Sequence, residues 1–284
     1  MTYEDPRVAL RGAGLRPKKG FGQNFLVAEG VARSIARACV RDDEVGRARV
    51  VEIGAGTGAL TQLLVERAGA VVAIERDRDL VPLLTAGVGG PTVRIVEGDA
   101  QTVDLAGLLG APGDGPRVLC GNLPYALTGQ LLRRAVECAP VIERAVFMVQ
   151  DEVADRLAAG PGTKEWGALT VFVHAAFAVS RLLRAPPGAF HPPPDVTSAV
   201  VELRPHVPPR AVETDRFRAL VRGAFAARRK TLRNAWARLA PDASILAAAA
   251  SRAGVSLDAR GETLDVEDYV RMEEALGALS AGRP

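Results

Sequence analysis

Residues 50–60 read Val-Val-Glu-Ile-Gly-Ala-Gly-Thr-Gly-Ala-Leu, and this stretch decides the fold class. An apolar run rich in β-branched residues, Arg49–Ile53, leads directly into a turn with glycines at 54, 56 and 58. A helical pattern, Ala59–Arg67, follows the turn. Glycines between a strand and a helix let the backbone approach a ligand and leave amide groups at the start of the helix available. The stretch therefore predicts an α/β protein with a nucleoside site at this turn.

The alternation of strand and helix extends to both sides of this turn. Short apolar runs predict strands, and apolar residues three or four apart predict helices. The further strands expected are Ala70–Ile74, Thr92–Val96, Arg117–Cys120 and Arg144–Val149. The further helices expected are Ala28–Val40, Arg78–Ala86, Leu105–Leu109, Thr128–Glu137 and Asp151–Ala159. This pattern implies a parallel sheet with helices on both faces.

The chain after Gly167 has a different pattern. Leu169–Val179 and Val196–Leu203 have strand-like composition and flank a proline-rich loop, Ala185–Asp195, so we expect an antiparallel edge of the sheet. Prolines in residues 205–212 disfavour helix and indicate a linker. We therefore expect a basic, extended arm over residues 1–24, an α/β domain over 25–204 and a helical domain over 213–284.

Two stripes are predicted in the helical domain. The buried stripe consists of Phe217, Leu220, Val221, Ala224, Phe225, Leu232, Trp236 and Leu239. The basic stripe consists of Arg218, Arg222, Arg229 and Arg233, on another face. Residues 6–28 and 204–240 together carry a charge of +13, whereas the whole chain carries only +3. Such segregated positive charge indicates a polyanionic partner.

Composition excludes several classes of protein. With 48% hydrophobic and 24% charged residues, the chain is neither disordered nor a coiled coil. No run of about 18 apolar residues occurs and the N-terminus has no secretion-signal pattern, so we expect a cytoplasmic protein without membrane contact. The three cysteines and three histidines have neither zinc nor disulfide spacing, so we expect no metal site and interpret the cysteines as buried.

Two acidic residues stand at the ends of the next predicted strands. Glu75 follows Gly54 by 21 residues, where a carboxylate can accept hydrogen bonds from both hydroxyls of a ribose. Asp99, in Gly98-Asp99-Ala100, can accept from an adenine amino group. The three glycines with two such acids favour S-adenosylmethionine as the ligand. The pattern Gly54-x-Gly56-x-x-Ala59 also satisfies a dinucleotide fingerprint, so the turn alone leaves both cofactors open.

The predicted strand at Val118–Cys120 ends in Gly-Asn-Leu-Pro-Tyr, residues 121–125, at the sheet edge where open α/β folds bind ligands. These groups suit methylation of an exocyclic amine, whose lone pair is delocalised into the base. The Asn122 side-chain oxygen and the Leu123 carbonyl can accept from the two N–H bonds and draw the nitrogen towards tetrahedral geometry. Pro124 stiffens the turn, and Tyr125 offers a face on which a flipped base can stack.

With these motifs, the chain resembles the small-subunit ribosomal RNA adenine dimethyltransferase family over nearly its whole length. The resemblance also rests on Gly22–Leu26, Gly98–Ala100, Val149–Ala154, Pro161–Lys164, Phe190–Val196 and Arg228–Asn234. It implies a Rossmann-like methyltransferase sheet of seven mostly parallel strands and a small helical C-terminal domain. It further implies that S-adenosylmethionine is used to dimethylate two adjacent adenines near the 3′ end of small-subunit rRNA, in ribosome biogenesis. We expect a monomer whose partner is this rRNA in a pre-30S-like particle.

The resemblance also implies roles for individual residues. The expected cofactor contacts are Gln23, Asn24, Leu26, Gly54, Gly56, Gly58, Glu75, Asp99, Ala100 and Asn122. The expected target-base pocket consists of Asn122, Leu123, Pro124 and Tyr125, with Phe190 as a second stacking face. The expected RNA contacts are Lys18, Lys19, Arg218, Arg222, Arg228, Arg229, Lys230 and Arg233.

Several alternatives remain open at this stage. A macrolide-resistance methylase would act on large-subunit rRNA with a similar fold, although the triple proline at 192–194 favours the small subunit. A ribosome-assembly factor would bind without needing catalysis. An NAD-dependent oxidoreductase would need a catalytic histidine or a Tyr-x-x-x-Lys pair, and neither is evident. Phe25, Phe190 and the arginine stripe also fit plain structural roles, and Trp236 and His174 are expected to be packed.

Overall fold

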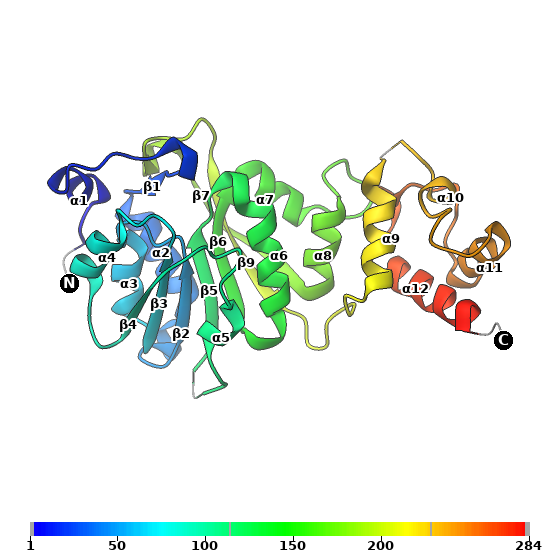
Figure 1. Ribbon diagram of the computed structural model, residues 1–284, viewed down its shortest axis with the longest axis horizontal. Helices are drawn as coiled ribbons and strands as arrows, with labels where there is room; N and C mark the ends of the chain where they lie inside the picture. The colour runs from blue at the N-terminus through cyan, green and yellow to red at the C-terminus, as the bar shows by residue number, and fades with distance from the viewer. Residues whose placement is uncertain (1–2, 114, 228, 282–284) are drawn as a thin grey trace. The chain divides into compact units, whose positions relative to one another are not determined.

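The computed structural model describes residues 3–113, 115–227 and 229–281, and its contacts divide the chain into two compact units (Figure 1). The first unit comprises Met1–Ala154 and Val179–Pro205, and the second comprises Asp155–Ala178 and His206–Pro284. Each unit contains a cluster of buried hydrophobic side chains. Within the described ranges, no helix combines the length and the apolar character needed to cross a membrane.

A seven-stranded sheet forms the centre of the first unit, in the order β4-β3-β2-β5-β6-β9-β7. The strands are β2 (Arg49–Ile53), β3 (Ala70–Glu75), β4 (Val93–Glu97), β5 (Arg117–Asn122), β6 (Arg144–Gln150), β7 (Phe177–Ala185) and β9 (Ser198–Pro205). Strands β2 to β6 pair in parallel, and β9 pairs with β6 in the antiparallel direction. The expected α/β fold with seven mostly parallel strands is therefore confirmed.

Apolar side chains explain why these strands are covered on both sides. Val50 and Val118 join a cluster with α2 and α3, while the alternate residues Val51 and Leu119 are equally buried. Such continuous burial is typical of a parallel sheet between helices. The helices of this unit are α1 (Pro6–Gly12), α2 (Glu29–Cys39), α3 (Ala59–Val65), α4 (Val81–Val88), α5 (Leu105–Leu109) and α6 (Thr128–Cys138), and α7 (Asp151–Ala158) begins in it.

The N-terminal arm is more ordered than the sequence predicted. Instead of being extended, it contains α1, because the Asp5 side chain accepts a hydrogen bond from the Arg7 amide at 2.8 Å and Pro6 stands at the first helical position. Leu10 of this helix is buried against Phe25 and Leu80. The arm continues through the short 3-10 turn η1 (Lys19–Phe21) into β1 (Phe25–Leu26), which pairs antiparallel with β8 (Phe190–His191). It therefore packs on the α/β unit.

The strand predicted at Leu169–Val179 is wrong. Helix α8 (Ala168–Ala176) occupies most of this stretch, and β7 begins only at Phe177. Residues 170–173 are all buried, so their side chains show no polar face, and periodicity alone cannot distinguish such a run from a buried strand. The helix also changes the domain boundary: residues 155–178 group with the helical unit rather than with the α/β domain expected over 25–204.

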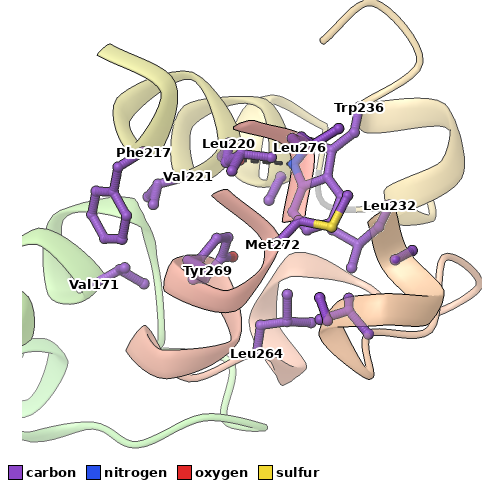
Figure 2. Close-up of a cluster of buried hydrophobic side chains, with 14 of the residues drawn as sticks. Val171, Phe217, Leu220, Val221, Leu232, Trp236, Leu264, Tyr269, Met272 and Leu276 are labelled. Atoms are coloured by element: carbon purple, nitrogen blue, oxygen red, sulfur yellow. Dashed lines mark hydrogen bonds between the residues drawn. The ribbon is translucent and has the colours of Figure 1, made fainter. Parts of the chain in front are cut away.

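Aromatic side chains form the core of the second unit (Figure 2). The ring of Tyr269 makes edge contacts with Phe217 and Trp236, at centroid distances of 6.3 and 6.2 Å. The polar atoms of this core are paired: Trp236 donates to the Leu220 carbonyl at 2.9 Å, and Tyr269 donates to the Gly261 carbonyl at 3.0 Å. Besides α8, the helices are α9 (Asp215–Ala226), α10 (Leu232–Ala235), α11 (Ala243–Ala253) and α12 (Val266–Ala281).

Of the segment predicted as a linker, residues 205–212, Pro205 ends β9, and residues 206–212 are held against the helices of the second unit. The amides of His206 and Arg210 each donate to the end of α8 at 2.9 Å, to the carbonyls of Ala176 and Ala175. The guanidinium of Arg210 also forms a two-pronged pair with Glu267 of α12, at 2.7 and 2.5 Å. The prolines exclude helix here as expected, but the chain is anchored.

Candidate active site

A cavity in the first unit opens at the carboxyl ends of the central strands. Its walls come from the ends of β2, β3 and β5 and from the loop after β4, and residues 21–26 of the N-terminal arm line it as well. Parallel strands that end at one edge of an open sheet place their following loops together, which is the usual ligand position in this architecture. The cavity therefore joins the glycine-rich turn, the two predicted acids and residues 122–125 in one site.

The glycines of the turn after β2 have different structural roles. Gly54 and Gly56 line the cavity with φ angles of 72° and 61°, a left-handed conformation that favours glycine. A Cβ at Gly56 would lie only 3.2 Å from the ring of Phe25. Gly58 does not line the cavity; a Cβ there would lie 3.1 Å from Leu84 and Val88 of α4. Gly58 thus allows helix packing rather than the predicted ligand contact.

Glu75, at the end of β3, is held by backbone amides. Its side chain is buried, and its two oxygens accept hydrogen bonds from the amides of Gly56 and Asp77, both at 2.7 Å. Burial raises the pKa of Glu75, and the two amide hydrogen bonds oppose that shift. The carboxylate is thereby fixed beside the glycine-rich turn, with lone pairs remaining for a ligand in the cavity.

Asp99 and Ala100 line the cavity after β4, as predicted. The Asp99 carboxylate accepts a hydrogen bond from the Gln101 amide at 2.9 Å and lies 3.3 Å from a guanidinium nitrogen of Arg76. Its side chain is partly exposed. The Gln101 side-chain nitrogen also lies 3.2 Å from each Asp99 oxygen, so the contacts occupy most of the roughly four acceptor positions of the carboxylate. A ligand amino group would therefore bind Asp99 by displacing the Gln101 side chain.

Gln23 and Lys18 fasten the arm to the loop after β3. Gln23 donates to one oxygen of Asp77 at 2.7 Å, and the Lys18 ammonium donates to the other at 2.6 Å and to Asp79 at 2.7 Å. Burial by itself raises the pKa of Asp77, but the hydrogen bonds from Lys18 and Gln23 lower it. The predicted role of Lys18 in RNA contact is not supported, because two carboxylates already neutralise its charge.

Glu52, in the middle of β2, is a buried acid on the cavity wall. Its carboxylate accepts a hydrogen bond from the Thr61 hydroxyl at 2.6 Å. Burial raises the pKa of Glu52 to about 7, and the nearby Glu75 adds to the shift. Glu52 is not among the predicted site residues, although an acid inside an otherwise apolar strand is a visible signal in the sequence.

Residues 122–125, at the end of β5 and just after it, also line the cavity. The Asn122 side-chain amide donates to the backbone carbonyl of Asn24 at 2.8 Å, so its oxygen is the atom left to accept. The Leu123 amide donates to the Met148 carbonyl at 3.0 Å, and the Pro124 carbonyl accepts from Leu127 at 2.9 Å. The turn is therefore held rigidly by backbone contacts to its neighbours.

Tyr125 completes this turn and is half-buried. Tyr125 lines the cavity, and its hydroxyl hydrogen-bonds the Ser198 hydroxyl of β9 at 2.8 Å. Burial raises the pKa of Tyr125, while the hydrogen bond with Ser198 acts in the opposite direction. Tyr125 is a neutral aromatic face at ordinary pH.

A family model described as Ribosomal RNA adenine dimethylase matches residues 14–277. The chain belongs to the ribosomal RNA adenine dimethylase family. Ribosomal RNA small subunit methyltransferase A of Anaeromyxobacter sp. (strain K) is 44% identical, over 97% of this chain and 99% of its own length. The protein of the same name from Myxococcus xanthus (strain DK1622) is 42% identical, over 98% of this chain and 97% of its own.

Solved structures show the same fold. A dimethyladenosine transferase from Plasmodium falciparum superposes with a TM-score of 0.73 at 23% identity, covering 88% of this chain and 96% of its own. The 23S rRNA methyltransferase ErmE superposes with a TM-score of 0.65 at 27% identity, covering 89% and 100%. This dimethylase is therefore an rRNA adenine dimethyltransferase of the expected fold class.

The structure does not support Phe190 as a second stacking face in this dimethylase. Phe190 is only 3% exposed and is not among the residues that line the cavity. Its ring packs in the core with α2 and α3 because β8 pairs with β1, which places Phe190 opposite Leu26. Leu26 lines the cavity as predicted. Phe21 and Phe25 supply aromatic walls from the arm instead, and the sequence analysis selected neither as a site residue.

The predicted RNA contacts fall into two groups in the dimethylase. Lys19, Arg222, Arg229 and Lys230 are exposed, whereas Arg218 pairs with Asp215 and Arg233 lies 3.1 Å from Asp258. The predicted stripe is not one helix face: α9 ends at Ala226, and Arg229 follows in a turn before α10. Arg228 lies outside the described residues.

Proposed function

We propose that this dimethylase uses S-adenosylmethionine to dimethylate the exocyclic amino groups of two adjacent adenines near the 3′ end of small-subunit rRNA. The observation that carries this proposal is the orientation of Asn122, whose amide donates to Asn24 and leaves an oxygen acceptor in the cavity. The names of the relatives at 44% and 42% identity support the small subunit as the source of the substrate. The likeness to ErmE, at 27% identity, is weaker.

The residues of the cavity fit the proposed cofactor. Gly54 and Gly56 line the cavity without side chains, so the backbone can approach a ligand closely, and a Cβ at Gly56 would press on Phe25. In this proposal Glu75, which two backbone amides hold at the cavity, accepts hydrogen bonds from two ribose hydroxyls, and Asp99 accepts one from an adenine amino group in exchange for its contact with the Gln101 side chain. Gln23, Asn24, Leu26 and Ala100 complete the proposed cofactor contacts. When bound, S-adenosylmethionine supplies an electrophilic methyl group.

The target amine is proposed to be activated by position rather than by a strong base. An adenine amino group donates two hydrogen bonds, to the Asn122 oxygen and to the Leu123 carbonyl. These acceptors draw the nitrogen out of conjugation and leave its lone pair available for alkylation. The alkylated amine is acidic and releases its proton without a base of high pKa. Precise placement of the amine, in a site shielded from water, accounts for the acceleration of methyl transfer in this proposal.

The target adenine must leave its strand to reach this site. Tyr125 stacks on the flipped base, a contact worth about 1–3 kcal/mol. The exposed basic residues contact RNA phosphates, which position the RNA without reading its sequence. We further propose that the protein acts as a cytoplasmic monomer on a pre-30S-like particle.

A methyl-transfer assay tests the proposal. Labelled S-adenosylmethionine is supplied with undermethylated small subunits, large subunits or naked rRNA, and the methylated nucleosides are identified after digestion. Dimethyladenosine from small subunits alone is the expected result. Label confined to large-subunit RNA would instead assign the activity of the macrolide-resistance methylases.

A role limited to ribosome assembly is tested by Asn122→Ala in cells that lack the protein. The variant removes the proposed acceptor without changing the exposed basic residues. Full recovery of small-subunit assembly without rRNA methylation would favour a binding role. Failure of both would support catalysis as the main role.

A further inference from the structure

A hydrogen bond across the end of the sheet holds the tyrosine of the proposed base pocket. The Tyr125 hydroxyl lies 2.8 Å from the Ser198 hydroxyl, although the two residues are 73 positions apart in the sequence. Ser198 is fully buried. A buried hydroxyl without a partner is costly, so each of these two hydroxyls depends on the other.

The sheet fixes the position of Ser198. It is the first residue of β9 and lies opposite Gln150, the last residue of β6. On its other side β6 pairs with β5, where Met148 lies opposite Asn122. Next to Ser198, the Thr197 carbonyl accepts from the Asp151 amide at 2.9 Å. The strand that carries Ser198 is thus anchored at the edge where the turn with Tyr125 begins.

The two ends of the tyrosine are therefore held by separate elements. Its backbone belongs to the turn after β5, in the 3-10 segment η3 (Tyr125–Leu127), and its hydroxyl is held by β9. Tyr125 lines the cavity, whereas Ser198 does not. The bond restricts the plane of the ring without placing Ser198 next to a substrate.

We infer that Ser198 is a positioning residue for Tyr125 and that its effect is largest in the second methyl transfer to each adenine. This inference rests on the proposed function. An unmethylated adenine amine donates two hydrogen bonds, to Asn122 and Leu123. A monomethylated amine has only one N–H, so one of these contacts is lost. The orientation of the monomethylated base then depends more on stacking against Tyr125. A loosely held Tyr125 ring should therefore disturb the second methyl transfer more than the first.

The test compares Ser198→Ala, Tyr125→Phe and the double variant. Each change removes the same hydrogen bond and leaves the aromatic ring in place. The expected result is a ratio of monomethyladenosine to dimethyladenosine about fivefold above wild type, the scale of one lost hydrogen bond. The double variant should match the single variants, because the second change has no bond left to remove. The inference would be overturned if the increase in this ratio in the double variant were the product of the increases in the two single variants. It would also be overturned if the ratio stayed at the wild-type value in the single variants.

A matched control removes a different buried hydroxyl. Thr170 of α8 is fully buried and donates to the Arg156 carbonyl at 3.1 Å, within the second unit. Thr170→Val should lower the melting temperature about as much as Ser198→Ala while leaving the product ratio and the Michaelis constant for S-adenosylmethionine unchanged. An equal change in product ratio in this control would show that lost stability, not positioning, causes the effect.

A spectroscopic measurement separates this inference from the proposed function. The chain has three tyrosines, so protein labelled with ¹³C-tyrosine gives three ring signals, and Tyr125→Phe identifies one of them. Ser198→Ala should shift that signal and leave those of Tyr3 and Tyr269 in place. An unshifted Tyr125 signal would overturn the positioning role. Absence of any methylated adenosine from wild-type protein would overturn the proposed function and the second-transfer effect, while the shifted signal would still establish the hold on Tyr125.

Discussion

The side-chain amide of Asn122 donates to the backbone carbonyl of Asn24 at 2.8 Å, across 98 positions of sequence. Asn24 belongs to the arm that Lys18 and Gln23 fasten to Asp77, whose own amide donates to Glu75. The arm therefore connects the residue proposed to bind the ribose with the residue proposed to bind the target amine. The packing of the arm therefore completes the site, because residues 21–26 line the cavity as well.

Asn122→Ala should lower methyl transfer at saturating cofactor by about 100-fold, because it removes a preorganised acceptor from the reacting amine. Asn24→Ala is the matched control. It keeps the backbone carbonyl that orients Asn122, so turnover at saturating cofactor should stay within about threefold of wild type. Single-turnover rates measure both. Equal losses in the two variants would contradict the assignment of Asn122 as the acceptor.

Glu75→Gln should weaken S-adenosylmethionine binding by about tenfold or more, measured by titration calorimetry. Both Glu75 oxygens accept from backbone amides at 2.7 Å, and a glutamine would turn an NH₂ group towards one of those N–H donors. Glu97→Gln is a control at the end of β4, since Glu97 is an exposed acid that pairs with Arg78. Cofactor affinity that is retained in Glu75→Gln would refute the ribose contact.

Phe190→Leu should leave methyl transfer within about twofold of wild type, because the ring of Phe190 is buried in the core. The free energy of unfolding should fall by about 1 kcal/mol, as for a moderate change of core volume. Urea unfolding and the methyl-transfer rate measure the two effects. A rate loss of about tenfold with normal cofactor binding would restore Phe190 as a stacking face.

Glu52→Gln should change how stability depends on pH. The pKa of Glu52 is raised from 4.5 to about 7 in the folded state, so this residue favours folding fully below about pH 4.5 and loses that contribution as the pH rises through 7. The shift corresponds to about 3 kcal/mol. In urea unfolding, the free energy of unfolding of the variant relative to wild type should rise by about this much between pH 4 and pH 8. A difference that is independent of pH would show that folding does not raise the pKa of Glu52.

Arg222→Gln should weaken binding to small-subunit rRNA and reduce the slope of log affinity against log salt by about one, as expected for one lost phosphate contact. Arg218→Gln is a control on the same helix. Because Arg218 already pairs with Asp215, its removal should change the slope much less. Filter binding across a salt series measures both. Similar slopes for Arg222→Gln and wild type would exclude Arg222 from the interface.

The sequence by itself determined the parallel strands of the sheet and the edge at which the site lies, but it did not determine β7, which begins only at Phe177. Strand β2 matches its predicted bounds, and the other parallel strands match within two residues, because apolar runs between helices are a local property of the chain. The glycine-rich turn was predictable for the same reason, since only glycine adopts its left-handed angles without strain. The family resemblance then implied the roles of Glu75 and Asn122.

The tertiary structure alone decided which side chains have partners. Lys18 is neutralised by Asp77, Phe190 is buried in the core, and Tyr125 is held by Ser198. These contacts join residues dozens of positions apart, and they depend on strand register and on how the arm packs. Sequence pattern records the local preferences of a residue and its neighbours. Burial and charge pairing are set by what the fold brings next to that residue.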